Sequence, residues 1–287
     1  MSTSLVNVNG RASFRRNDRY LDVERASGGR FSSDPMDAIT RFDDLHSWVA
    51  GLEAGVVSEA VDETTLGPPV PHPQKVFGVG LNYTDHAEEA GLELPKEPLI
   101  FTKFPNCLTG PRADVILTSN RVDYEVELVV VIGEGGRNIA ESDALSKIAG
   151  YCVGQDISDR RMQFAGKPPQ FSMGKSVDTF GPLGPGVVSL DQLADPNDLA
   201  ISCEVSGETL QKARTSLMVF AVPELVAWLS KYCTLVPGDL IFTGTPAGVG
   251  SVRDPRRYLK PGDTITSTIE GLGTLENTCA PPQGDGL

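Results

Sequence analysis

The sequence predicts a β-dominated α+β fold with a small module at its N-terminus. Short apolar and β-branched segments recur along most of the chain, helical patterns are few, and a proline-rich segment follows the first part. Strand and helix patterns do not alternate regularly, which argues against a doubly wound parallel sheet. We therefore predict two domains: residues 1–70 form a small N-terminal domain with its linker, and residues 71–287 form the larger domain.

The N-terminal module contains a short strand pattern around Leu21–Val23 and one helix pattern. Apolar residues at Phe42, Leu45, Val49 and Leu52 are spaced as on one face of a helix. The segment 67–73 then holds four prolines, which exclude both a helix and a central strand. This segment predicts a stiff linker.

In the larger domain, strand patterns dominate and two helices are expected, at Glu141–Ala149 and Val222–Tyr232. The clearest strand is the β-branched stretch Val122–Gly133, which ends in a glycine. The other expected strands are Val76–Val79, Leu99–Thr102, Tyr151–Gly154, Leu199–Val205, Leu240–Thr243 and Thr264–Ile269.

Composition narrows the class of partner. The formal net charge of −13 disfavours nucleic acid as a partner, because phosphate backbones are repelled. No apolar run approaches the roughly 20 residues of a membrane span, and the first ten residues lack the pattern of a signal peptide. The five cysteines are scattered without a C-x-x-C pair, which disfavours a zinc site and a disulfide framework. We expect a cytoplasmic protein without a membrane partner.

Two glutamates interrupt the apolar strand pattern. Because side chains alternate along a strand, Glu125 and Glu127 should share one face. Asp156 follows another strand and could join them. Three carboxylates without histidine or cysteine ligands favour Mg²⁺ or Mn²⁺. The alternative is an exposed edge strand whose glutamates lie in water.

A second group of polar residues offers acid–base and anion-binding chemistry. His86 and Glu89 are three apart on a short helix that Asp85 would cap, so the carboxylate could orient the imidazole as a general base. Arg160 and Gln163 would share a helical turn next to Asp156, where arginine suits a substrate carboxylate. Lys175 lies in a glycine-flanked loop. For each of these, an ordinary solvent-exposed side chain is the alternative.

These residues belong to a series of ordered motifs that resembles the fumarylacetoacetate hydrolase family. The resemblance spans about residues 75–279. Its motifs are Val79-Gly80-Leu81-Asn82-Tyr83 with Asp85-His86, Asp123-Tyr124-Glu125-Val126-Glu127-Leu128, Gln155-Asp156-x-Ser158-x-Arg160, Gly174-Lys175-Ser176, Asp178 to Pro185, Pro237-Gly238-Asp239, Gly244 to Gly250, and Glu270-Gly271-Leu272-Gly273.

The resemblance implies a mixed β-sandwich and roll fold, a homodimer, and a set of site roles. It implies Mg²⁺ or Mn²⁺ held by Glu125, Glu127 and Asp156. It also implies that His86 and Glu89 activate water on a lid, and that Lys175 is catalytic. Arg160, Gln163 and Thr245 would line the site of a small 2-oxo acid substrate.

The activity expected from the resemblance is hydrolysis of a C–C bond in a 2,4-dioxo acid such as an acylpyruvate, through a metal-stabilised enolate. The same enolate chemistry would serve an oxaloacetate-type decarboxylase or a tautomerase or isomerase of a 2-oxo acid, which are the alternatives. A catalytically silent scaffold is disfavoured because His86 and Lys175 are both present. Two departures from the family pattern, Gln155 and Arg161, leave the substrate open.

Overall fold

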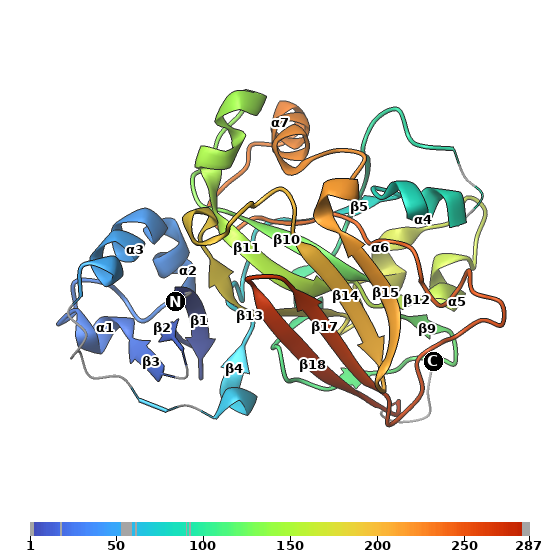
Figure 1. Cartoon of the computed structure of the whole chain (residues 1–287), viewed down its shortest axis with the longest axis horizontal. Helices are drawn as coiled ribbons and strands as arrows, with labels where there is room; N and C mark the ends of the chain where they lie inside the picture. The colour runs from blue at the N-terminus through green and yellow to red at the C-terminus, as the bar shows by residue number, and fades with distance from the viewer. Residues whose placement is uncertain are drawn as a thin grey trace.

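The computed structural model describes residues 3–17, 19–52, 59–60, 62–89, 91 and 93–282. At residues 86–88 it gives the helical backbone and not the side chains. Within these ranges two sheets dominate and the helices are short (Figure 1). The predicted β-dominated fold is therefore confirmed.

The larger sheet has eleven strands and runs through the whole molecule. Its pairs are antiparallel except β16 with β5 and β13 with β7. Along its main path the strands are β3 (Arg19–Asp22), β2 (Arg11–Arg16), β1 (Thr3–Val8), β13 (Gly181–Val188), β11 (Ile148–Gln155), β10 (Val126–Ile132), β16 (Leu240–Phe242), β5 (Val76–Gly80) and β6 (Leu99–Thr102), while β4 (Leu66–Gly67) and β7 (Leu108–Thr109) pair at its side.

A second sheet of five strands packs against the first. Its strands, in order, are β15 (Glu208–Arg214), β14 (Ala200–Val205), β17 (Thr264–Ile269), β18 (Gly273–Ala280) and β8 (Val115–Ile116). A small two-stranded sheet joins β9 (Val122–Asp123) to β12 (Ser158–Asp159). This small sheet brings the segment before β10 beside the segment after β11.

The helices flank the sheets. The α-helices are α1 (Val23–Ala26), α2 (Pro35–Thr40), α3 (Phe42–Ala50), α4 (Thr84–Glu89), α5 (Arg160–Gln163), α6 (Phe171–Gly174) and α7 (Val222–Tyr232). The 3₁₀ helices are η1 (Glu63–Thr65), η2 (Pro105–Cys107), η3 (Glu141–Lys147), η4 (Leu190–Gln192) and η5 (Thr215–Leu217). In Figure 1 the elements α1–α3 gather at one end of the molecule and α4–α6 at the other.

Strand β10 lies in the centre of the large sheet and both of its faces are buried. Val126, Leu128 and Val130 enter the core shared with the second sheet. Val129 and Val131 enter a separate core together with residues of α2 and α3. Burying one such side chain contributes about 1.5–3 kcal/mol. The exposed-edge alternative for this strand is therefore wrong, and its glutamates are not in bulk water.

The N-terminal segment adds its strands to the large sheet. Ser4 and Leu5 of β1 lie opposite Val188 and Val187 of β13, so strands β1–β3 extend the sheet of the larger domain. The helix predicted in this segment is confirmed as α3. The boundary after residue 70 stays a prediction.

Two local expectations differ from the structure. The helix predicted at Glu141–Ala149 is instead a 3₁₀ helix that ends at Lys147, because Ile148 already begins the buried strand β11. Helix α4 begins at Thr84, so Asp85 lies inside the helix rather than capping it. Helix α7 matches its predicted range.

Within the described ranges, no helix has the length and apolar character needed to cross a membrane.

Candidate metal centre and active site

Three carboxylates meet where β10 and β11 pair. Glu127 lies in β10, Glu125 directly precedes it, and Asp156 directly follows β11. The antiparallel register sets Val126 opposite Gln155, and the backbone N–H of Asp156 donates to the Glu125 carbonyl at 2.9 Å. One ligand oxygen from each carboxylate lies within 4.8 Å of the others, and all three residues are buried. The sequence predicted this cluster.

The ammonium of Lys175 lies between two of these carboxylates. Its Nζ donates to Glu125 Oε2, Asp156 Oδ2 and Ser158 Oγ, each at 2.7 Å. The loop after α6 carries this lysine, whose side chain is only 3% exposed. The alternative of an exposed lysine is therefore wrong. The positive charge of Lys175 thus compensates part of the negative charge of Glu125 and Asp156.

The negative charge of Glu127 is less well compensated than the charges of Glu125 and Asp156. Its Oε2 accepts the backbone N–H of Gly244 at 2.8 Å, and within the described ranges it forms no ion pair. Gly244 can approach because it has no Cβ: its φ is +98°, and a Cβ would lie 2.8 Å from the Cβ of Asn82. A buried carboxylate without an ion pair is costly, so this position favours a further cation.

The donor set fits a hard divalent cation. All candidate ligands are carboxylate oxygens, which Mg²⁺ and Mn²⁺ prefer. Ion pairs join Glu125, Asp156 and Asp123 to the buried cations Lys103, Lys175 and Arg160. Glu127 has no such partner among the described residues. Glu125, Glu127 and Asp156 would hold the ion.

The titration of Glu127 predicts how pH affects the metal-free protein. Burial raises the pKa of Glu127 well above its ordinary 4.5, and the charges of Asp156 and Glu125 raise it further. The folded protein therefore binds this proton more tightly than the unfolded chain does. The resulting stabilisation is complete below about pH 4.5 and is lost as pH rises through the raised pKa.

We expect Glu127→Gln to become more stable than the unsubstituted protein as pH rises from about 5 to about 8, both in excess chelator. Glutamine keeps the shape of the protonated acid but never takes the charge. Melting temperatures measured over this pH range would check the expectation, and parallel curves for the two proteins would contradict it. Added Mn²⁺ should reverse the order at the upper end.

Arg160 lies beside the cluster and pairs with two protein acids. Its guanidinium donates through Nε to Asp123 Oδ2 at 2.9 Å and through Nη2 to Glu125 Oε1. Its Nη1 donates to Gln163 Oε1 at 2.8 Å, within the turn α5. Burial opposes the charge, yet Glu125 and Asp123 raise the pKa of Arg160 above its usual value. Arg160 therefore holds Glu125 of the cluster next to Asp123, and a contact with substrate stays a prediction.

Thr245 closes the cluster from the loop after β16. Its hydroxyl donates to the carbonyl of Val126 at 2.8 Å and accepts from Gln211 Nε2 at 2.8 Å. Gln211 comes from β15, so the second sheet fixes this loop against β10. Thr245 is 4% exposed and lines the same pocket as Arg160 and Gln163.

The cluster opens into a cavity of about 260 Å³ with a mixed lining. Its ionic or polar lining residues are Glu125, Glu127, Arg160, Gln163, Lys175, Thr245 and Ser251. Its apolar lining residues are Val79, Leu81, Phe101, Phe164, Pro169, Phe171, Val249 and Val252. Arg161 is exposed and is not among the lining residues, so it adds no charge to this cavity.

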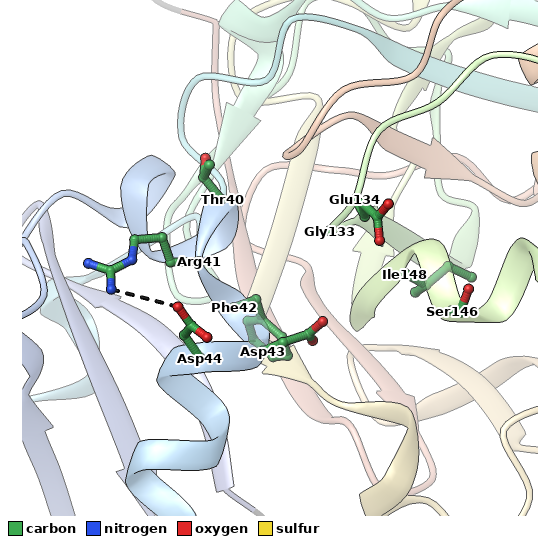
Figure 2. A pocket seen from close by; sticks show the side chains of 9 residues that line it. All are labelled: Thr40, Arg41, Phe42, Asp43, Asp44, Gly133, Glu134, Ser146 and Ile148. Atoms are coloured by element: carbon green, nitrogen blue, oxygen red, sulfur yellow. Dashed lines mark ion pairs between the residues drawn. The ribbon is translucent and has the colours of Figure 1, made fainter.

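A second cavity of similar size, about 270 Å³, lies between the N-terminal helices and the loop after β10 (Figure 2). Its acids Asp43, Asp44 and Glu134 are all exposed. Asp44 pairs with Arg41 at 3.7 Å, and Glu134 pairs with Lys147. The acids of this cavity are therefore open to solvent, unlike the buried cluster, and this cavity is the weaker candidate.

The predicted dyad is described only in part. The side chain of His86 lies outside the described residues, so its contact with Glu89 is not described. The carboxylate of Glu89 is exposed and accepts the backbone N–H of Gly248 at 2.8 Å. Helix α4 is thereby tied to the loop 244–250 that carries Thr245. The role of both residues in activating water stays a prediction.

Three supporting residues were not assigned a role from the sequence. Asp123, wholly buried, accepts from Arg160 and from the backbone of Gly250 and Ser251. Gln155 accepts the backbone N–H of Glu125 and donates to Ser267 Oγ. Lys103 donates to Asp156. The sequence feature that could have indicated a role for Lys103 is its position directly after an apolar strand.

Comparison with known proteins assigns the family. The family model described as fumarylacetoacetate (FAA) hydrolase C-terminal matches residues 75–280. The chain therefore belongs to the fumarylacetoacetate hydrolase family, as its motifs predicted, and the buried acidic cluster is its candidate divalent-metal site.

Relatives within the family differ in the reaction for which they are named. The mitochondrial oxaloacetate tautomerase FAHD2A of Bos taurus is 47% identical over 217 residues, 75% of this chain and 69% of that protein. A candidate HpcE protein from Mycobacterium smegmatis has 46% identity and a TM-score of 0.90, over 97% and 99% of the chains. Maleylpyruvate hydrolase from Sphingobium sp. SYK-6, in complex with manganese(II) and pyruvate, has 27% identity and a TM-score of 0.81, over 99% and 100%.

Proposed function

We propose that this chain catalyses the tautomerisation of an oxaloacetate-like 2-oxo acid and that it uses Mg²⁺ or Mn²⁺. The observation that carries the proposal is the buried cluster of Glu125, Glu127 and Asp156 with the Lys175 ammonium 2.7 Å from two of them. The identity of 47% to a protein named an oxaloacetate tautomerase favours this reaction over C–C hydrolysis.

The reaction moves one proton from oxygen to carbon. The enol hydroxyl of the substrate loses a proton and C3 gains one, so no water is consumed. A divalent cation held by the three carboxylates would act as a Lewis acid on the 2-oxo oxygen. Lys175 carries a proton at Nζ in the same cavity and is the proposed acid and base for C3.

The remaining site residues would orient the acid. Gln163 and Thr245 line the cavity beside the carboxylate cluster and offer a side-chain amide and a hydroxyl. Arg160 would help to hold the substrate carboxylate, although Asp123, Glu125 and Gln163 already take most of its donors. Its first role is to fix Glu125, and through it the cation.

We expect the protein to speed the decay of enol-oxaloacetate, followed by its ultraviolet absorbance, in the presence of Mg²⁺ or Mn²⁺. Excess chelator should remove this activity. Lys175→Met should lower the rate at least about 100-fold, as expected for the loss of a general acid–base group. Lys212→Met, which changes an exposed lysine of β15, serves as the matched control. An unchanged enol decay with the protein and metal present would contradict the proposal.

The second candidate is hydrolysis of a 2,4-dioxo acid. The apolar lining residues of the cavity favour it, because an acyl group would pack against them whereas the second carboxylate of oxaloacetate would not. His86 and Glu89 would then activate water. Release of pyruvate from acylpyruvates in the same assay tests this candidate. If acylpyruvates are cleaved and enol-oxaloacetate is unaffected, hydrolysis replaces tautomerisation; a decarboxylase would instead release carbon dioxide from oxaloacetate.

We further propose that the protein is a cytoplasmic homodimer whose residues 1–70 form a small domain that shares the large sheet through β1 and β13. Light scattering during size-exclusion chromatography would measure the oligomeric state. A measured mass equal to that of one protomer would contradict the dimer without affecting the proposed reaction.

A further inference from the structure

Lys103 is the most deeply buried cation near the carboxylate cluster that the proposed reaction does not use. Its side chain is 0% exposed. It directly follows strand β6, and its backbone N–H donates to the carbonyl of Val76 at 2.9 Å. Pairing with β5 therefore sets the direction in which the side chain enters the protein.

The three protons of the Lys103 ammonium all have acceptors. Nζ donates to Asp156 Oδ1 at 2.7 Å, to the carbonyl of Phe180 at 3.2 Å and to the carbonyl of Lys175. An ammonium has three donors and no acceptor, so this set is complete. The ring of Phe242 lies 5.7 Å from Nζ and covers it with an apolar surface. The ammonium is thus held in one position.

The Lys103 ammonium occupies one of the two carboxylate oxygens of Asp156. Oδ1 accepts from Lys103, whereas Oδ2 accepts from Lys175 at 2.7 Å. A cation that used both oxygens of Asp156 would lie closer to the Lys103 charge and would compete with it for Oδ1. Lys103 therefore leaves Asp156 one oxygen to offer.

We propose that Lys103 selects the metal, because it restricts Asp156 to a single-oxygen ligand and so favours a small six-coordinate cation over Ca²⁺. Mg²⁺ requires near-octahedral geometry, whereas Ca²⁺ takes six to eight oxygens and readily accepts bidentate carboxylates. The inference rests on the divalent cation of the proposed function. It concerns the ratio of the Ca²⁺ affinity to the Mn²⁺ affinity. Removing one positive charge changes both affinities in the same direction and does not by itself determine their ratio.

The test is isothermal titration of Mn²⁺ and Ca²⁺ into the metal-free protein and into Lys103→Met. The ratio of the Ca²⁺ to the Mn²⁺ dissociation constant should fall about 10-fold or more in Lys103→Met, within the range for residues that support a metal ligand. The matched control is Lys75→Met, which likewise removes a lysine from a buried carboxylate, Asp239, at 2.8 Å. Asp239 is not part of the cluster, so the control should keep the ratio of the unsubstituted protein.

If Lys103 had a purely structural role, its loss would weaken the binding of Ca²⁺ and Mn²⁺ equally. An unchanged ratio of the two dissociation constants would therefore overturn the inference. A second measurement does not depend on the folding of the variant. In crystals of the unsubstituted protein grown with Mn²⁺, Asp156 should bind the ion through one oxygen while Lys103 stays on the other. Bidentate Asp156 would also overturn it. If the unsubstituted protein binds neither ion, the metal site of the proposed function fails as well, and the two failures are thereby distinguished.

Discussion

Glu127→Gln is expected to abolish divalent-metal binding and activity while leaving the protein folded. Supporting residues around metal ligands typically contribute 10- to 100-fold to metal affinity, so the loss of a ligand carboxylate should cost at least about 100-fold. Glutamine keeps the size of the side chain and can still accept the N–H of Gly244. Titration calorimetry with Mn²⁺ gives the affinity, and the enol decay assay gives the activity.

The matched control for this variant is Glu134→Gln. Glu134 lies two residues after β10, is exposed, and lines the other cavity (Figure 2). It should keep both metal affinity and activity. An unchanged Mn²⁺ affinity in Glu127→Gln would remove Glu127 from the ligand set, whereas loss of metal binding in Glu134→Gln would move the site to the second cavity.

The local part of the site could be predicted from sequence because it depends on periodicity. Alternation along a strand places Glu125 and Glu127 together, and one helical turn places Gln163 beside Arg160. The structure has both arrangements: Glu125 and Glu127 share the buried cluster, and Arg160 donates to Gln163. Such patterns need only neighbours within a few residues.

The long-range part could not be predicted in the same way. Lys103 lies 53 residues before Asp156 and reaches it only because β6 pairs with β5 and β5 with β16. Nothing in the spacing of these segments specifies their order in the sheet. The addition of β1 to β13 is a similar case, since a proline-rich linker suggests a separate module and does not exclude a shared sheet.

The same limit explains why Arg160 has a different immediate role from the one expected. Its spacing from Asp156 suggested a free guanidinium for substrate. The small sheet of β9 and β12 instead brings Asp123 beside it, and this acid is 37 residues away in sequence. A cationic side chain next to a metal site can therefore form ion pairs with the metal ligands rather than with the substrate. Sequence spacing does not reveal which acids compete for it.

Arg160→Met should lower the free energy of unfolding of the metal-free protein by about 3–5 kcal/mol, the cost of removing one partner from a buried ion pair. The substitution leaves the carboxylates of Asp123 and Glu125 buried without this cation. Arg160→Lys keeps the charge but loses the planar fork that reaches both acids, so an intermediate loss is expected. Denaturant unfolding in excess chelator, followed by circular dichroism, would measure these differences.

The neighbouring Arg161→Met is the matched control, because Arg161 is exposed and lies outside the cavity. A surface substitution of this kind should change the unfolding free energy by no more than about 0.5 kcal/mol. If Arg160→Met and Arg161→Met cause equally small losses of unfolding free energy, the guanidinium of Arg160 does not hold Asp123 and Glu125. Arg160 would then be free to bind substrate, and a raised KM in Arg160→Lys with stability unchanged would show it. The stability and kinetic measurements together thus separate a residue that supports the metal ligands from one that binds the substrate.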